Sequence, residues 1–324
     1  MPLDPHVRRL LAMMALGGAA PPGPEQRRQA QRLLARLAGT EALPVIAQAV
    51  TLPLPSGARE ARLFTPLACR APGPGIVFLH GGGLVAGDLD THDAIGSRLA
   101  AASACRVLAV GYRLAPEHPF PAAIEDAVAA MHCVAAMARR LGIDPEHLAV
   151  AGESAGAGLA ARLCQELRGT GPAIAAQLLL CPVLDLRCIA ASHREFASGY
   201  LLDAATVRHD IEACGIAGLV DTPRVSPLLE PDLTGLPPAR IHTAACDPFR
   251  DDGAAYAERL AKSGVSVVQS CHPGMIHFFY GLGRLVPAAR PLLSQIAADF
   301  GALLRGDAAL PAHSPMHDDQ RRTS

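Results

Sequence analysis

The chain has 324 residues, with 29 basic and 30 acidic side chains and a formal net charge of −1. This balance argues against a nucleic-acid partner, because binding a phosphate backbone requires a concentrated excess of Lys and Arg. Half of the residues are apolar, which is enough for a large core. The length favours one large α/β domain with a cap, or two smaller domains.

The N-terminal segment superficially resembles a secretion signal, because Arg8 and Arg9 precede the apolar stretch Leu10–Leu16. Asp4 comes before the arginines, however, and the pattern fits a short amphipathic helix, which is the interpretation we favour. A second helix is expected over Glu25–Leu37.

Short β-like runs alternate with longer helical runs along most of the chain. The expected strands cover Ala49–Leu54, Ala61–Phe64, Gly75–Leu79, Val107–Tyr112, Leu148–Gly152, Ala176–Cys181, Ala239–Ala244 and Val265–Ser270. The expected helices cover His92–Ala104, Ala122–Leu141, Ser154–Leu167, Asp251–Lys262 and Ala288–Leu304. Continuous apolar strands are usually buried on both faces by helices. The pattern therefore predicts an α/β fold with a mostly parallel sheet of eight strands and helices on both faces.

Two regions break this alternation, and we interpret them as parts of one helical cap. Residues 1–40 are helical without a strand, and residues 185–225 form an irregular to helical insertion between two strands. Such segments are placed to cover the carboxyl ends of the strands, where open α/β sheets bind ligands. The core then comprises residues 41–184 and 226–305. Residues 306–324 are polar and aperiodic and are expected to form a disordered tail.

Membrane and redox signals are weak. No uninterrupted apolar run reaches the ~18 residues that a membrane-spanning helix requires. The nine cysteines include no C-x-x-C pair, which argues against a disulfide framework or a zinc site. Buried free thiols in a reducing compartment are the simplest interpretation, so we expect a cytoplasmic protein.

The strongest chemical signal is the G-x-S-x-G sequence Gly152–Gly156. An apolar run precedes it and a helical pattern follows, which is the context of a nucleophile elbow. The sharp strand-to-helix turn forces Ser154 into a strained conformation, and small flanking residues let neighbouring chain pass close by. The helix N-terminus also favours the negative charge that develops during attack.

A second signal, His80-Gly81-Gly82-Gly83, ends an earlier apolar strand. Consecutive glycines leave backbone N–H groups free to point at one spot. Together with the N–H of Ala155 they are suited to hold a tetrahedral oxyanion. The alternative is a tight glycine turn without a catalytic role.

Serine is a poor nucleophile without a base, and the base needs an orienting acid. After a serine elbow, the acid and the histidine follow in chain order, each just beyond a late strand. Asp247 follows the expected strand Ala239–Ala244, and His277 follows Val265–Ser270. We therefore expect Asp247 and His277 to complete a catalytic triad with Ser154.

Competing candidates are weaker. His242 lies inside an expected strand and His272 just at the end of one. Asp251 and Asp252 come at the start of the expected helix Asp251–Lys262, where capping that helix is the commoner role of an acidic residue.

Several separated motifs resemble the hormone-sensitive lipase-like family of α/β-hydrolase esterases, over about residues 42 to 305. They are His80–Gly83, Gly87–His92, Tyr112–Glu117, Gly152–Gly156, Ser226–Leu228 and Asp247–Asp251. The resemblance implies an α/β-hydrolase fold and a serine carboxylesterase.

By the same resemblance, Ser154 is the nucleophile, His277 the general base and Asp247 its orienting acid, while the amides of Gly81, Gly82 and Ala155 form the oxyanion hole. No metal or cofactor is needed for this chemistry.

Four further residues are expected to support the site: His80, Gly83, Glu153 and Tyr112. In the family, the histidine at the position of His80 orients the glycine loop, and the Tyr112–Glu117 segment supports it. Arg113 and Glu117 are expected to form a pair, either buried or on the surface.

The chain departs from the family pattern at some positions. Glu153 stands where Asp or Thr is usual, and Cys181 stands where Tyr is common. Phe278 follows His277 where Gly is usual, so its ring is expected to narrow the site or shift the base. Leu84 replaces a large aromatic residue, which suggests a wider pocket mouth that accepts acyl chains beyond acetyl.

These motifs imply hydrolysis of short- to medium-chain carboxylic esters. An amidase, lactonase, carbamate hydrolase or deacetylase would use the same triad and stays open as the alternative. A binding receptor is disfavoured, since related receptors have lost the histidine that His277 provides here. Relatives often associate, so a homodimer is compatible with the sequence.

Overall fold

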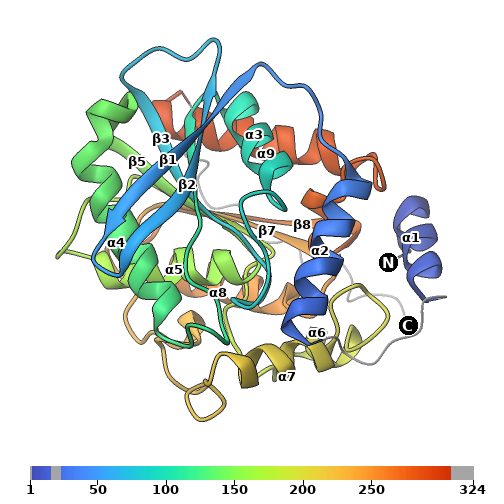
Figure 1. Cartoon of the computed structure of the whole chain (residues 1–324). Helices are drawn as coiled ribbons and strands as arrows, with labels where there is room; N and C mark the ends of the chain where they lie inside the picture. Colours follow the sequence, from blue (N-terminus) through green and yellow to red (C-terminus); the bar gives the residue numbers. More distant parts are fainter. Residues whose placement is uncertain (1, 16–22, 308–324) are drawn as a thin grey trace, which may run out of the picture.

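The computed structural model describes residues 2–15 and 23–307. Its centre is one eight-stranded sheet with the order β1-β2-β4-β3-β5-β6-β7-β8. The pairs β1/β2 and β2/β4 are antiparallel, and every other neighbouring pair is parallel. Figure 1 shows this twisted sheet with helices packed around it. The expected mostly parallel sheet of eight strands is confirmed.

The strands are β1 Val45–Leu54, β2 Gly57–Pro66, β3 Gly73–Leu79, β4 Arg106–Val110, β5 Ile143–Glu153, β6 Gln177–Leu180, β7 Ala239–Cys246 and β8 Val267–Ile276. The α-helices are α1 Pro5–Ala15, α2 Pro24–Ala38, α3 Asp93–Ser103, α4 Ala122–Met137, α5 Ala155–Leu167, α6 Ala191–Glu195, α7 Ala204–Ala213, α8 Arg250–Lys262 and α9 Ala289–Arg305. Short 3-10 turns are η1 Ala138–Leu141, η2 Pro227–Leu229 and η3 Phe279–Gly281.

Two apolar clusters fill the space on the two faces of the sheet. Because side chains alternate along a strand, Val77 and Leu79 of β3 join one cluster while Ile76 and Phe78 join the other. The first cluster includes side chains from α4, α5 and α8, and the second includes side chains from α3 and α9. Helices on both faces therefore explain why the central strands read as continuous apolar runs.

β1, β2, β5 and β8 all extend beyond the ranges expected from the sequence, and the two edge strands show why. β1 begins at Val45 rather than Ala49, because it pairs with β2 along its whole length at the sheet edge. Much of it is exposed, so it lacks the apolar pattern that marks the inner strands. β8 continues to Ile276 although it contains Pro273 and Gly274. An edge strand tolerates a proline because one of its sides needs no ladder hydrogen bonds.

The two segments interpreted as a cap contain helices. α1 and α2 confirm the two helices expected near the N-terminus, and α6 and α7 lie between β6 and β7. Arg27 of α2 pairs with Asp210 of α7, which joins the two segments in space. Residues 16–22 and 308–324, which include most of the expected tail, lie outside the described residues. Among the helices that the structure describes, none has both the length and the apolar character to span a bilayer.

Candidate active site

Ser154 sits at a sharp turn between β5 and α5. Its backbone has φ 56° and ψ −122°, a left-handed region that is strained for a residue with a Cβ. A Cβ on Gly152 would come within 2.2 Å of the Gly156 carbonyl oxygen, and one on Gly156 within 2.2 Å of the Leu79 carbonyl oxygen. The small residues around Ser154 are therefore required by backbone packing, as expected for a nucleophile elbow.

The structure brings Ser154, His277 and Asp247 together. The distance from Ser154 Oγ to His277 Nε2 is 2.7 Å, and that from His277 Nδ1 to Asp247 Oδ2 is 2.8 Å. All three residues are buried, Asp247 completely. Asp247 and His277 directly follow β7 and β8, so neighbouring parallel strands deliver both to the same sheet edge. This hydrogen-bonded chain can activate a hydroxyl for nucleophilic attack.

The electrostatics of His277 suit a base. Burial lowers its pKa, but the negative charge of Asp247 and the hydrogen bond to it more than offset this, so the pKa of His277 is raised above its ordinary value. Asp247 is itself held in place, because its Oδ1 accepts the backbone N–H of Phe249 at 2.8 Å.

One of the expected oxyanion donors is already hydrogen-bonded in the structure. The N–H of Gly81 donates to Nε2 of His92 at 3.1 Å, so it is not free to stabilise an oxyanion. Gly82 and Gly83 follow with φ of 115° and 68°. Within residues 2–15 and 23–307, their amides donate to no protein acceptor. The free donors of this loop are thus one residue further along the chain than expected.

His92 is a site residue that the sequence analysis quoted within a motif but gave no role. A backbone N–H can only donate, so His92 Nε2 must accept and Nδ1 must carry the proton. Nδ1 then donates to Thr91 Oγ1 at 3.0 Å, and Thr91 Oγ1 donates to the Asp88 carbonyl at 2.9 Å. The His92 side chain, oriented by these hydrogen bonds, therefore anchors the glycine loop.

Glu153 lies beneath this loop. Its carboxylate is completely buried, with Oε2 at 3.5 Å from His92 Nε2. Among the described residues, neither carboxylate oxygen has a hydrogen-bond partner. A Cβ on Gly81 would meet Glu153 Oε2 at 1.9 Å, so a side chain at position 81 would displace the buried carboxylate.

His80, at the start of the glycine loop, packs against Tyr112. Their rings stack at 4.3 Å, and the Tyr112 hydroxyl donates to the His80 carbonyl at 2.6 Å. His80 Nδ1 lies 2.9 Å from the Gly81 carbonyl. Burial lowers the pKa of His80 to about 3, so the ring is neutral near pH 7. These contacts suit the expected orienting role better than that of a second base.

The competing residues are engaged elsewhere. His242 Nδ1 and His272 Nε2 lie 3.2 Å apart, and their rings stack. The expectation that Asp251 and Asp252 cap a helix is wrong in detail: α8 has no side-chain cap. Both residues lie in its first turn, but their side chains contact the inserted segment, as described below.

The expected pair of Arg113 with Glu117 is also corrected. Arg113 binds Asp126, with Nε to Oδ1 at 3.0 Å, and also Glu125. Glu117 instead receives two hydrogen bonds from Arg28 of α2. Sequence proximity favoured the first pairing, but the helices that pack nearby supply closer partners.

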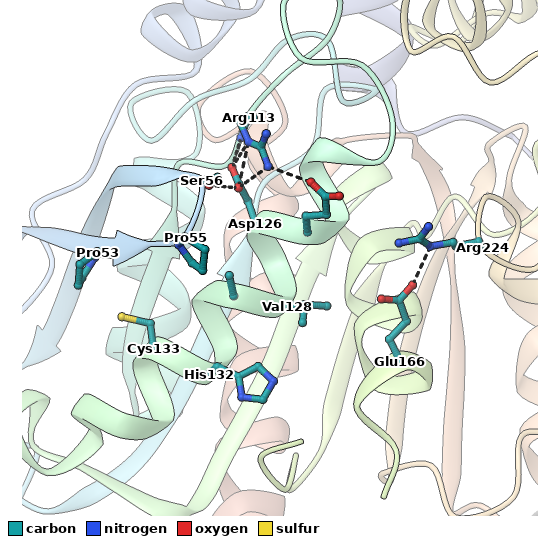
Figure 2. A pocket seen from close by; sticks show the side chains of 12 residues that line it. Pro53, Pro55, Ser56, Arg113, Asp126, Val128, His132, Cys133, Glu166 and Arg224 are labelled. Atoms are coloured by element: carbon teal, nitrogen blue, oxygen red, sulfur yellow. Dashed lines mark hydrogen bonds and ion pairs between the residues drawn. The ribbon is translucent and has the colours of Figure 1, made fainter. Parts of the chain in front are cut away.

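Arg113 and Asp126 line an open groove of about 920 Å³ that also includes Ser56 and Arg224 (Figure 2). Neither the triad nor the glycine loop lines this groove. Its size alone therefore does not make it the substrate site, and its charged side chains bind one another.

Phe278 does not displace the base. It adopts φ 61°, which explains why glycine suits this position. Its ring packs edge-on against His92 at 5.7 Å, while His277 keeps both of its triad hydrogen bonds. The expected shift of His277 is therefore not seen.

The residues that could hold a metal ion overlap with the triad. One ligand atom each of Cys181, Asp247 and His277 lies within 4.8 Å of the other two. Asp247 and His277 are already bonded to each other, and His277 to Ser154. The geometry thus fits serine-based acyl transfer directly, without requiring a metal ion.

Comparisons with known proteins agree with this geometry. A family model described as alpha/beta hydrolase fold matches residues 76–281. The chain belongs to this family. The expected α/β-hydrolase fold, the resemblance to esterases related to hormone-sensitive lipase and the class of carboxylic ester hydrolase are confirmed.

Several curated relatives are esterases. Carboxylesterase NlhH of Mycobacterium tuberculosis is 42% identical over 70% of this chain and 73% of its own. Ethyl acetate hydrolase of Pseudomonas putida is 37% identical over 82% and 85%. Among solved structures, an ester hydrolase from the Lake Arreo metagenome, bound to a bipyridine phosphonate derivative, has a TM-score of 0.86 and 37% identity, covering 93% of this chain and 98% of its own.

The His92 anchor generates a test. Replacing His92 by Leu removes the acceptor for the Gly81 N–H, so the loop should lose alignment and kcat should fall by about 10- to 100-fold with little change in KM. A trifluoromethyl ketone accepts the serine hydroxyl at its carbonyl carbon, and its oxygen then becomes an oxyanion like that of the reaction. The affinity for such a ketone should fall in parallel with kcat. Because Gln can place a carbonyl oxygen near the former Nε2, His92→Gln should keep most of the activity. Equal losses in both variants would contradict the anchor.

The triad predicts a pH profile. Protonated His277 cannot accept the Ser154 proton, so kcat/KM should fall as the pH decreases through the pKa of His277. Because that pKa is raised, the fall should begin above the ordinary value of about 6.5. Asp247→Asn should move the acid limb to lower pH and reduce kcat by roughly 10⁴-fold. An unmoved limb would contradict the assignment of Asp247.

Proposed function

We propose that this esterase hydrolyses short- to medium-chain carboxylic esters through an acyl-enzyme on Ser154, with His277 as base and Asp247 as orienting acid. The observation that carries the proposal is the chain of two short hydrogen bonds from Asp247 through His277 to the strained Ser154. A purely structural serine would have no need of this combination.

The reaction follows from the positions of these groups. His277 Nε2 takes the Ser154 proton as the hydroxyl oxygen bonds to the ester carbonyl carbon, and the carbonyl oxygen becomes an oxyanion. His277 then gives the proton to the leaving alcohol as the ester bond breaks. Water repeats both steps on the acyl-enzyme and releases the acid.

The amides of Gly82, Gly83 and Ala155 are the donors that we propose for the oxyanion. Gly82 and Gly83 carry the N–H groups left free by the anchoring of Gly81. Ala155 begins α5, so its N–H has no partner within the helix. One such donor is typically worth about 3 kcal/mol of transition-state stabilisation.

We propose that an apolar cavity next to Leu84, the residue directly after the glycine loop, receives a small acyl or alcohol group; the triad itself does not line it. It measures about 50 Å³, and its walls include Leu84 after the glycines, Leu159 one turn into α5, and Leu186, Cys214 and Ile216 of the inserted segment. Its apolar lining favours unbranched or lightly branched hydrocarbon over charged substituents.

We propose that residues 1–40 and 185–225 form one cap. The pair between Arg27 and Asp210 joins them. Arg28 also donates to the carbonyl of Val85, just beyond the glycine loop, and to that of Ala115, whose N–H donates to the Leu84 carbonyl. The cap would thus rest on the segment that shapes the pocket.

A cytoplasmic location is supported by the cysteines, since all nine are free thiols and a reducing compartment keeps them so. The homodimer stays a prediction.

A receptor without activity is disfavoured by the hydrogen bond between His277 and Ser154. An amidase or lactonase would show itself by turnover of its own substrate class with the same triad.

Covalent labelling tests the nucleophile. A fluorophosphonate should modify the wild-type protein at a single peptide containing Ser154, with a burst of chromophore from a p-nitrophenyl ester. Ser154→Ala should abolish both signals, reducing kcat by at least about 10⁴-fold. Labelling at another serine, with activity retained in Ser154→Ala, would refute the assignment.

A chain-length series tests the pocket. Leu84→Trp adds a ring at the wall of the small cavity, so kcat/KM for butyrate and longer p-nitrophenyl esters should fall by about 10-fold or more relative to acetate, because overfilling a packed site is unfavourable. Leu219→Trp, at an exposed position of the inserted segment 185–225, provides the control. An unchanged preference in Leu84→Trp would remove Leu84 from the pocket.

A further inference from the structure

The loop that carries the catalytic acid has its own internal bonds. Directly after β7, Asp247 Oδ1 accepts the N–H of Phe249, and the Asp247 carbonyl accepts the N–H of Arg250 at 3.1 Å. The pairing of β7 with β8 sets Cys246 beside Ile276, directly before Asp247 and His277. Beyond Asp247 the chain leaves the sheet, and there the loop makes further contacts with another part of the chain.

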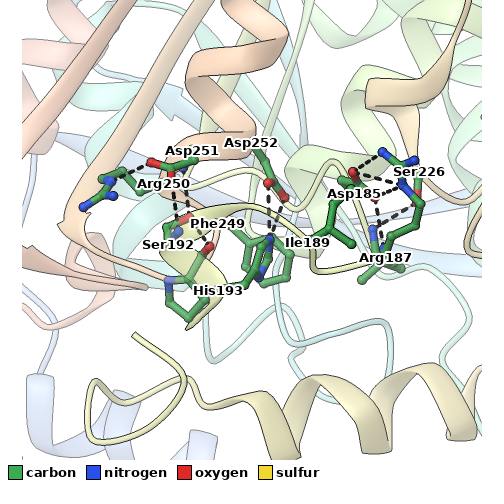
Figure 3. Close-up of polar contacts among 12 residues, drawn as sticks. Asp185, Arg187, Ile189, Ser192, His193, Ser226, Phe249, Arg250, Asp251 and Asp252 are labelled. Atoms are coloured by element: carbon green, nitrogen blue, oxygen red, sulfur yellow. Dashed lines mark hydrogen bonds and ion pairs between the residues drawn. The ribbon is translucent and has the colours of Figure 1, made fainter. Parts of the chain in front are cut away.

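Such contacts come from α6 in the inserted segment, and Ser192 is their centre (Figure 3). Its Oγ donates to the Pro248 carbonyl at 2.6 Å and accepts the Asp251 N–H at 3.3 Å. Its own N–H donates to Asp251 Oδ2 at 2.9 Å. Ser192 is completely buried. The side chain and amide of Ser192 therefore bind Pro248 and Asp251, the two residues on either side of Phe249 and Arg250 in the chain.

Neighbouring residues reinforce the same junction. His193 Nε2 lies 3.2 Å from each carboxylate oxygen of Asp252, and the His193 ring packs edge-on against Phe249 at 4.7 Å. Burial lowers the pKa of His193, but hydrogen bonds with Asp252 and Cys188 raise it overall, whereas burial raises the pKa of Asp252. Arg250 also binds Glu195 at the end of α6.

We propose that Ser192 is a positioning residue for the reaction, which holds the loop after Asp247 so that the Asp247 carboxylate stays bonded to His277. The inference rests on the proposed function of the triad. It gives α6 a role beyond the proposed cap: the inserted segment that lines the proposed substrate cavity also holds the loop of the catalytic acid in place.

Loss of the Ser192 hydroxyl would leave the Pro248 carbonyl and the Asp251 N–H without this partner in a buried place. An unsatisfied buried group is unfavourable, so the loop would shift to find new partners. Small shifts suffice, because displacement of a catalytic group by about 1 Å can cost 100-fold in rate. A displaced Asp247 would bind His277 less well and hold less negative charge beside it.

The pH profile separates positioning from mere stability. The ionisable side chains that face His277 are Asp247 after β7, Glu153 at the end of β5 and Cys181 after β6. Of these, Asp247 is the group that Ser192 holds in place. Weakening the contact with Asp247 should lower the pKa of His277, so the acid limb of kcat/KM should move to lower pH.

Ser192→Ala is the test, and Ser226→Ala is its matched control. Ser226 is equally buried. Its Oγ accepts the Leu186 N–H at 3.0 Å and donates to the Val220 carbonyl at 2.7 Å, without touching residues 247–252. Both variants lose one buried hydroxyl with two bonds, so both should lower the melting temperature. Only Ser192→Ala should move the acid limb.

For Ser192→Ala we expect kcat to fall about 10-fold, KM to stay within about twofold and the acid limb to shift down. The downfield proton resonance of His277 Nδ1–H should weaken or move upfield. If Ser192→Ala does not fold, Ser192→Cys, of similar size but with a weaker donor, should show the same changes in smaller measure.

Two outcomes would overturn different claims. A lowered melting temperature with an unmoved acid limb, unchanged kcat and an intact resonance would refute the positioning role and leave the esterase proposal standing. A wild-type protein without ester hydrolysis would refute the proposed function, while the resonance would still report whether Ser192 holds Asp247 against His277.

Discussion

Three backbone segments approach closely around Ser154: the end of β3, the end of β5 and the start of α5. This close approach is the constraint on which the rest of the site depends. Gly156 lies so near the end of β3 that any side chain would strike the Leu79 carbonyl. The same contact brings the glycine loop after β3 beside the start of α5. The nucleophile and the proposed oxyanion donors are thus placed by a single packing arrangement, and the strain at Ser154 is offset by the surrounding sheet.

Behind this arrangement lies a buried polar network that keeps the glycine loop in one shape. His92 accepts the Gly81 N–H, and Tyr112 donates to the His80 carbonyl. Glu153 fills the space against Gly81. Buried polar groups are costly unless they are bonded, so the hydrogen bonds made by His92 and Tyr112 restrict the loop to few conformations. Preorganised donors of this type need no reorganisation when charge develops on the substrate.

The inserted segment is connected to both halves of the site. Leu186 and Ile216 line the apolar cavity beside the glycine loop, whereas Ser192 and His193 bind the loop after Asp247. Asp210 of the same segment meets Arg27 near the N-terminus. On the two proposals above, substitutions in this segment act on the chemistry by two routes, one through substrate fit and one through the placement of the catalytic acid.

Local sequence patterns determined much of this protein: the alternating strands and helices, the elbow around Ser154, and the positions of Asp247 and His277 just beyond strands. Each of these follows from short-range chemistry, such as apolar runs, glycine spacing and chain order. The extent of the edge strands was less predictable, because exposed β1 lacks an apolar pattern and β8 contains a proline.

Only the tertiary structure decided which side chains meet across long distances in sequence. Arg113 binds Asp126 rather than Glu117, Gly81 is anchored by His92, and Ser192 reaches the Asp247 loop. The physical reason is that hydrogen-bond partners are selected by three-dimensional packing. A motif specifies which groups are present, but the folded backbone specifies which of their donors and acceptors remain free for chemistry.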